Sequence, residues 1–295
     1  MGLLLQTLTF GVLLGSLYAL ASSGLALTYG VLRIVNLVHG SLLIAGGYVT
    51  YTMWSGFGID PILSVPLSAA TVGVLGGVLY LAFVRPAAPG GEGGIMMATF
   101  ALMIAGQGAF ALVWGNNPLT VAVPYTRASF VVGDLIIPEA QLYAAVAAVA
   151  VLVVLVLLLQ KTKFGRAIRA AAANPAGARF VGIDVGRINA LTYSLGSATA
   201  GAAGALISLV YPLTPDAWTQ WLGRCLAIVV LGGLGSMAGT FIAALVLGIL
   251  ETFTTTYVSL SWTAAVPYFV ILIVLIVRPA GILGRRGRTD VVAAA

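Results

Sequence analysis

Long apolar runs, separated by short stretches of charged residues, proline and glycine, follow one another along almost the whole chain. Each run suits a helix that crosses a bilayer, which takes about 20 apolar residues. The pattern predicts an all-α polytopic membrane protein with about eight transmembrane helices in a single transmembrane domain, residues 1–295. The expected spans are 3–29, 36–54, 61–84, 95–114, 141–159, 188–211, 223–255 and 264–277.

The run 223–255 differs from the others because Gly232-Gly233-Leu234-Gly235-Ser236 interrupts it. Glycines at this density stop a helix and expose backbone groups, which a membrane tolerates only where protein or a water-filled cavity surrounds them. The run is also too short for two full spans and a connection. We therefore expect a re-entrant or half-helix hairpin that lines a path. The alternative is one long helix that uses its glycines for close packing.

Composition agrees with a membrane protein, since 60% of the residues are hydrophobic and only 7% are charged. A soluble domain carries about 25% charged residues because its surface faces water. Intrinsic disorder would need low hydrophobicity. The single cysteine and the single histidine exclude internal disulfides and metal sites built from several such residues. We expect no metal and no cofactor.

Basic residues are concentrated in the loop 160–187, which holds six, and in the tail 278–295, which holds four of the fourteen in the chain. Basic loops next to membrane spans stay in the cytoplasm. The sequence therefore predicts a cytoplasmic loop 160–187, a cytoplasmic C-terminal tail and an N-terminus outside. This clustering suits a membrane face better than nucleic acid, so no nucleic-acid partner is expected.

One segment of the basic loop carries both the start and the stop signal of a short helix. Asn174 can cap free amides, Pro175 suits the first helical position and Gly182 suits a left-handed stop. A helix this short needs packing to persist, and Phe180 and Val181 offer an apolar anchor. We expect a docking helix; a basic loop that merely sets topology is the alternative.

Motifs along nearly the whole chain occur in the order of one known family. They are Tyr29-Gly30-Val31-Leu32-Arg33-Ile34-Val35-Asn36-Leu37-Val38-His39-Gly40, Gly165-Arg166-Ala167-Ile168-Arg169-Ala170, Asn174-Pro175, Val181-Gly182-Ile183-Asp184-Val185, Tyr211-Pro212-Leu213-Thr214-Pro215, Val229-Val230-Leu231-Gly232-Gly233-Leu234-Gly235-Ser236 and Arg278-Pro279-Ala280-Gly281-Ile282-Leu283-Gly284. With these motifs the chain resembles the permeases of ATP-binding-cassette (ABC) importers for branched-chain amino acids, in particular the shorter, H-type subunit.

The resemblance implies the ABC importer permease fold and the uptake of branched-chain or other hydrophobic amino acids through a bacterial plasma membrane. The implied partners are a second homologous permease in a heterodimer, two cytoplasmic ATP-binding subunits and a periplasmic or lipid-anchored substrate-binding protein. The implied ATPase contacts are Asn174, Pro175, Arg179, Phe180 and Gly182. The chain has no G-x-x-x-x-G-K-[ST] phosphate-binding loop, so we expect a transport subunit without its own ATPase site.

Polar residues inside apolar runs are costly in lipid and are functional candidates by default. Arg33, Asn36 and His39 stand three residues apart, which predicts one helical side that lines the path or its inner gate. A structural cap that holds the connection between the first two spans is the alternative. The candidate path residues are Arg33, Asn36, His39, Gly233, Gly235 and Glu251.

Other functions remain open on the residues alone. The cargo could be another small solute, such as urea, a short amide or a sugar. A secondary transporter would also use broken helices, but it usually needs buried carboxylates for ion coupling, and Glu251 stands nearly alone. A channel would have no use for a capped docking helix, and a membrane protease would need a nucleophile with an orienting base.

Overall fold

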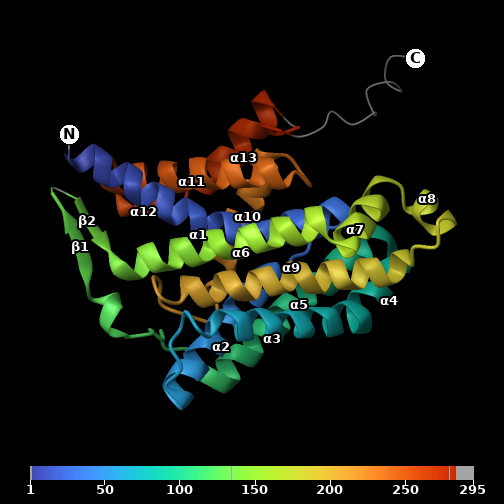
Figure 1. The fold of residues 1–295 in the computed structure, drawn as a ribbon, viewed down its shortest axis with the longest axis horizontal. Coiled ribbons are helices and arrows are strands. Elements are labelled where there is room, and N and C mark those ends of the chain that lie inside the picture. Colours follow the sequence, from blue (N-terminus) through green and yellow to red (C-terminus); the bar gives the residue numbers. More distant parts are fainter. Residues whose placement is uncertain (1, 134, 279, 284–295) are drawn as a thin grey trace.

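The structure is a computed structural model that describes residues 2–133, 135–278 and 280–283, most of them in α-helices (Figure 1). The long helices are α1 (Gly2–Leu32), α2 (His39–Phe57), α3 (Val65–Leu79), α5 (Gly91–Trp114), α6 (Glu139–Lys161), α9 (Val185–Ile207), α10 (Trp218–Gly232) and α11 (Met237–Tyr257). The shorter ones are α4 (Arg85–Ala87), α7 (Lys163–Ala173), α8 (Pro175–Phe180), α12 (Leu260–Thr263) and α13 (Val266–Val277). Strands β1 (Ser129–Val132) and β2 (Leu135–Pro138) form an antiparallel hairpin.

Two of the helix reversals follow local sequence signals. Gly58 ends α2 in the left-handed conformation, at φ 65°, and its N–H donates to the carbonyls of the last turn. Helix α3 continues through a π-helical turn, η1 (Tyr80–Val84), into α4. The 3₁₀ turn η2 (Ala88–Gly90) and a left-handed Gly91 then reverse the chain into α5. Glycine takes these conformations without the penalty that a Cβ would bring.

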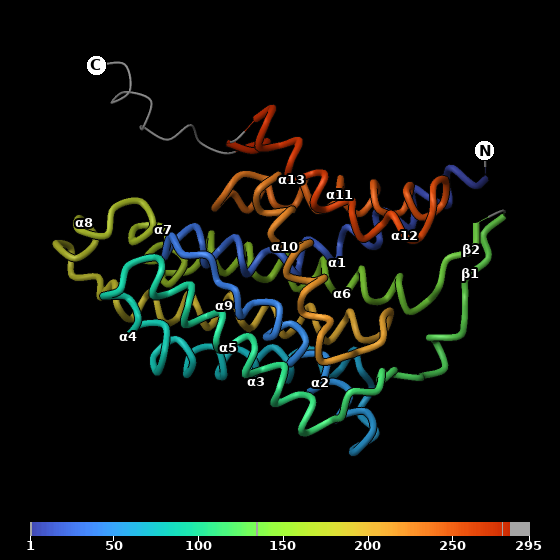
Figure 2. The backbone as a smooth tube through the Cα atoms, turned by 180° about the vertical axis from the view of Figure 1, so that it is seen from behind, coloured from blue at the N-terminus to red at the C-terminus, as the bar shows by residue number. Residues whose placement is uncertain are grey.

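Helix α1 lies in the middle of the molecule, with α11, α9 and α6 packed along it (Figures 1 and 2). Its approach to α11 depends on missing side chains. A Cβ on Gly11 would lie 2.7 Å from the Cα of Ile249, and one on Gly15 would lie 2.8 Å from the Cα of Leu245. Helices in lipid gain little from the hydrophobic effect, so close backbone packing of this kind holds them together.

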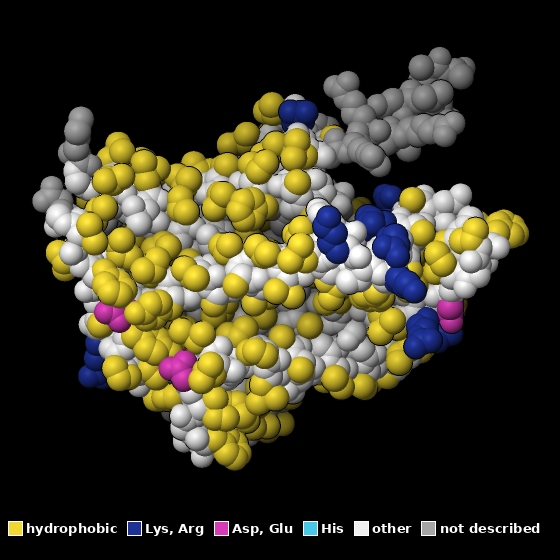
Figure 3. Space-filling model, viewed as in Figure 1, with side chains coloured by type: hydrophobic (Ala, Val, Ile, Leu, Met, Phe, Trp, Pro, Cys, Tyr) yellow, Lys and Arg dark blue, Asp and Glu magenta, His cyan; other side chains and the backbone are white. Residues whose placement is uncertain are grey.

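The sides of the molecule are mostly covered with hydrophobic side chains, and most of the few visible charges lie towards its two ends (Figure 3). Lysine and arginine gather at the end where α7 and α8 lie, which we call the basic end. The β1–β2 hairpin lies at the opposite end, which we call the hairpin end. Large hydrophobic side chains such as Leu112, in the last turn of α5, are exposed (89%). This distribution fits a body whose sides contact lipid.

The helical fold class is confirmed. Four helical stretches are long and apolar enough to cross a membrane: Gly2–Leu32, Val65–Trp114 with its turn inside, Glu139–Lys161 and Met237–Tyr257. The predicted break in 223–255 is present as the connection 233–236 between α10 and α11. Helix α11 alone, with 21 residues, is as long as a full span, which the sequence did not lead us to expect. The hairpin was not predicted either.

The loops at the hairpin end are tied to one another by polar contacts. The backbones of Leu119 and Leu213 pair through two hydrogen bonds of 2.9 and 2.8 Å. The Tyr125 hydroxyl donates to the Asp60 carboxylate, with 3.2 Å to each oxygen. Burial, reinforced by the negative charge of Asp60, raises the pKa of Tyr125 well above its usual range, so this hydroxyl keeps its proton.

Candidate functional site

Helix α7 is an amphipathic helix at the basic end. Its first turn is capped by the Thr162 hydroxyl, which accepts from the Gly165 amide at 3.0 Å. Ile168 and Ala171 are buried in an apolar cluster that also contains Leu159 of α6. The Arg169 guanidinium donates to the Leu159 carbonyl and so extends the attachment to α6. Helix α7 is therefore anchored to α6 by apolar packing and by a hydrogen bond.

Helix α8 has the two ends that the sequence predicts. The Asn174 side chain accepts from the Gly177 amide at 2.9 Å, Pro175 occupies the first helical position, and Gly182 lies at φ 81°. One side of the helix is fixed to the protein through Ala178, which is 4% exposed in the same apolar cluster as α7.

The apolar anchor of α8 faces outward. Phe180 is 92% exposed and Val181 is 74% exposed. Arg179, the residue before Phe180, is exposed as well. Figure 1 shows α8 projecting at the basic end, beyond the ends of the neighbouring helices. A large aromatic side chain at such a protrusion is available to a partner protein.

The expectation that Arg33, Asn36 and His39 share one helical side is wrong. Helix α1 ends at Leu32 and α2 begins at His39, so 33–38 is a connection rather than a helix. Arg33 adopts a left-handed backbone at φ 58°, which directs it away from any helical continuation. It is exposed, whereas Asn36 and His39 are 1% and 0% exposed.

Asn36 and His39 fasten the connection to the surrounding helices. The Tyr193 hydroxyl of α9 donates to the Asn36 side-chain oxygen at 2.9 Å. The His39 Nε2 donates to the Ala21 carbonyl of α1 at 2.8 Å, while its buried Nδ1 has no described partner. These contacts agree with the capping alternative for the two residues. The spacing in the sequence was misleading because polar residues three positions apart can also be buried in a connection that is not helical.

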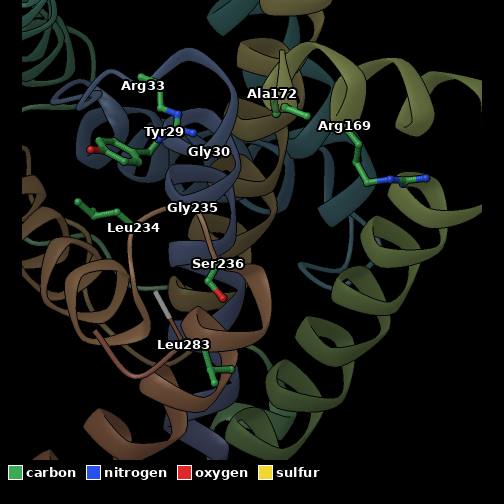
Figure 4. Close-up of a pocket in the computed structure, with 10 residues that line it drawn as sticks. Tyr29, Gly30, Arg33, Arg169, Ala172, Leu234, Gly235, Ser236 and Leu283 are labelled. Carbon is green, nitrogen blue, oxygen red and sulfur yellow. The ribbon is translucent and has the colours of Figure 1, made fainter. Parts of the chain in front are cut away.

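Gly235 and Arg33 line the same cavity at the basic end, of about 590 Å³, between α1, α7 and the 233–236 connection (Figure 4). Gly233 and Gly235 have φ angles of 95° and 82°, and the Ser236 hydroxyl caps α11 by accepting from the Gly239 amide at 3.1 Å. Arg169 of α7 also lines this cavity, and Figure 4 shows its guanidinium end directed away from Tyr29 and Gly235. The cavity lining contains neither Asn36, His39 nor Glu251.

Glu251 lies elsewhere, in a buried polar cluster between α1, α10 and α11. It is 2% exposed and forms an ion pair with Arg224, whose Nε lies 3.1 Å from Oε1 and 3.3 Å from Oε2. The Tyr18 hydroxyl donates to the same carboxylate. The guanidinium carbon of Arg224 lies 5.3 Å from the centre of the Trp221 ring, within cation–π range.

Arg224 was missed in the sequence, although a signal for it was present. A charge inside an apolar run needs a partner of opposite sign, and Glu251 is the carboxylate that stands in the same apolar run, 223–255. Their separation of 27 positions hid the pair, because helical spacing rules connect only residues three or four positions apart. The two are brought together by the reversal of the chain at 233–236.

Comparisons with known proteins point to one family. A family model described as a branched-chain amino acid transport system permease component matches residues 7–275. The high-affinity branched-chain amino acid transport system permease protein LivH of Escherichia coli K12 is 29% identical, over 95% of this chain and 96% of its own. The probable LivH of Methanocaldococcus jannaschii is 30% identical, over 92% and 90%. The ribose import permease RbsC of Bacillus subtilis is 29% identical, over 80% and 70%. No solved structure matches the chain.

Proposed function

The chain belongs to the branched-chain amino acid transport permease family, and on this premise we propose that it is the transmembrane permease subunit of an ATP-driven importer for branched-chain amino acids. The observation that carries the proposal is the extent of the similarity. The LivH relatives and this chain cover one another almost completely, so the family resemblance includes both the membrane body and the loop at the basic end.

Coupling to ATP hydrolysis is assigned to α8. Asn174, Pro175 and Gly182 fix the two ends of the helix, while Arg179 and Phe180 are exposed in its last turn. An ATP-binding subunit at this position would receive an aromatic anchor, the typical centre of a protein–protein contact. Because α8 is joined to the body through α7 and Ala178, a push on the helix reaches α6 and α9.

The proposed topology places the basic end in the cytoplasm and the N-terminus outside. It comprises about eight transmembrane helices, with α10 and α11 as the glycine-broken hairpin that makes an even number of crossings. Basic residues at one end support this orientation. Three of the four basic residues of the predicted tail 278–295 fall in 284–295, outside the described residues. The membrane is the plasma membrane of the cell.

The proposed assembly contains a second, homologous permease in a heterodimer, two ATP-binding subunits and an external substrate-binding protein. Within this chain, Arg33 and Gly235 form the inner mouth of the path with Gly233 behind them, since the first two line the cavity at the basic end. Asn36 and His39 hold the α1–α2 connection in place. Glu251 contributes to the path indirectly, because it holds Arg224 in position.

A sugar is the second candidate cargo, because the ribose permease relative covers 80% of the chain. The amino acid permeases cover more of the chain and more of their own length, so they are favoured. A secondary transporter gains no support from any relative.

The direct test is transport by the complete complex in proteoliposomes, reconstituted with ATP-binding subunits, a second permease and a substrate-binding protein from the same organism. We expect ATP-dependent uptake of leucine, isoleucine or valine, and no uptake when the ATPase subunits carry an inactivated phosphate-binding loop. Uptake of ribose in place of the amino acids would contradict the proposed substrate. Uptake without ATP would contradict the proposed ATP-driven mechanism.

Orientation is tested separately by thiol labelling in intact cells. Cys225, the single native cysteine, is buried and gives little background. A cysteine at Ser129 should react with an impermeant reagent from outside, and one at Ala176 only after the membrane is opened. Both positions are exposed. Labelling of both from outside would contradict the topology.

A further inference from the structure

The Arg224 guanidinium uses only part of its hydrogen-bonding capacity within the protein. Its Nε donates to both oxygens of Glu251, and no described residue accepts from Nη1 or Nη2. These two amino groups carry four of the five N–H donors of an arginine side chain. The side chain retains 15% of its exposure, so the guanidinium is not sealed inside the helices. The pair therefore presents an open fork of donors.

The surroundings hold the guanidinium in place. Glu251 fixes Nε, and Tyr18 fixes Glu251 from α1. The guanidinium carbon lies 5.9 Å from the Tyr18 ring centre and 5.3 Å from that of Trp221, and these two rings meet edge to face. Three side chains, one each from α1, α10 and α11, thus orient one cation inside the membrane body.

Unpaired donors at such a position are costly, because lipid offers them no acceptor. Because the Arg224 side chain is 15% exposed, water or a solute that reaches the site can supply that acceptor. The planar fork of arginine matches a carboxylate, which it binds through two parallel hydrogen bonds. Resting on the proposed function, we propose that Nη1 and Nη2 of Arg224 bind the α-carboxylate of the amino acid during its passage.

Charge decides which carboxylates fit. Arg224 and Glu251 together are neutral, so a simple carboxylate would leave a net negative charge in a medium of low dielectric constant. A zwitterionic amino acid brings its own ammonium group and keeps the site neutral. The Glu251 carboxylate and the face of the Trp221 ring offer that ammonium a favourable environment. The site therefore selects zwitterionic amino acids over the corresponding 2-oxo acids and over uncharged sugars.

The test uses two variants in the complete complex. Arg224→Lys keeps the positive charge beside Glu251 but removes the fork. The double variant Arg224→Glu, Glu251→Arg keeps an ion pair but moves the guanidinium from α10 to α11. Arg127→Lys, in an exposed loop at the hairpin end, is the matched control. Leucine uptake, ATPase activity stimulated by leucine-loaded binding protein, and thermal stability are measured for each.

We expect both Arg224 variants to lower leucine uptake about 10- to 100-fold, the range for losing a charge-assisted hydrogen-bond pair. Arg224→Lys should keep ATPase stimulation and thermal stability near the parental values, since docking and folding do not use the fork. Arg127→Lys should leave uptake unchanged.

Parental uptake by Arg224→Lys would overturn the assignment, and so would recovery of uptake in the charge-swapped variant, which would make the pair architectural. If Arg224→Lys instead released the second permease or a bound anionic lipid, Nη1 and Nη2 would bind that partner. This result would equally reject the binding of the transported amino acid at Arg224. A parental complex that does not import branched-chain amino acids contradicts the proposed function itself.

Discussion

Two glycines, Gly182 and Gly235, have almost the same φ angle but opposite surroundings. Their φ angles are 81° and 82°. A Cβ on Gly182 would meet no atom within 4 Å, whereas one on Gly235 would lie 3.0 Å from the Cα of Gly30. The first ends the projecting helix α8, and the second lies in the connection between α10 and α11.

The difference separates two kinds of order. Helix α8 is shaped by its own caps, Asn174 and Gly182, and holds on to the body mainly through Ala178. The 233–236 connection is shaped by its neighbours, since α1 leaves room there for backbone alone. A region ordered by local signals can bind a partner without disturbing the rest, while a region ordered by packing joins distant helices into one body.

The largest loss of stability is expected in the packed region, from Glu251→Ala. Removing one partner of a buried ion pair leaves Arg224 uncompensated and costs about 3–5 kcal/mol. Thermal unfolding of the purified permease measures the loss. Glu139→Ala, at the start of α6 and half-buried, is the control. Similar shifts for both variants would contradict a buried pair.

A smaller loss is expected from Gly235→Val. The left-handed backbone costs a residue with a Cβ about 1–2 kcal/mol, and contact with Gly30 adds about 1–3 kcal/mol of overpacking. Gly108→Val, where a Cβ meets nothing within 4 Å, is the control for the same measurement; Gly11 is unsuitable because it packs on Ile249. Equal stability of the two variants would contradict the close packing of the 233–236 connection against α1.

Gly182→Ala should lower the stability of α8 alone, by about 1–2 kcal/mol, which is what a residue with a Cβ loses in a left-handed backbone conformation. Hydrogen exchange should become faster at the amides of 177–183, while global thermal unfolding stays within about 0.5 kcal/mol of the parent. If global unfolding shifted as far as in Gly235→Val, the comparison between the two glycines would fail.

Features encoded locally were predictable from the sequence. The caps of α8 at Asn174 and Gly182, and the break at Gly233 and Gly235, depend on residues within a few positions of one another. The long apolar runs likewise predicted most helices, since a membrane span is a property of a single segment.

Features that need distant partners were not predictable. Arg224 meets Glu251 only because the chain reverses between them, and Arg33 leaves the expected helical side because its backbone turns left-handed. Strand β1 (Ser129–Val132) lacks the polar and apolar alternation of a half-buried strand, so nothing in its pattern predicted the pairing with β2.

The most direct test of the account is Phe180→Ala, for which the smallest effect on stability is expected. Phe180 is 92% exposed and packs on nothing in the body, so folding should be unchanged. Leu112→Ala, at 89% exposure in the last turn of α5, is the matched control. Co-purification of the ATP-binding subunits and ATP-dependent leucine uptake are measured for both. We predict that Phe180→Ala loses at least about tenfold in both, as expected for removal of a central aromatic anchor worth about 2 kcal/mol, and that Leu112→Ala loses neither. Full assembly and full uptake by Phe180→Ala would show that the ATP-binding subunits do not dock on α8.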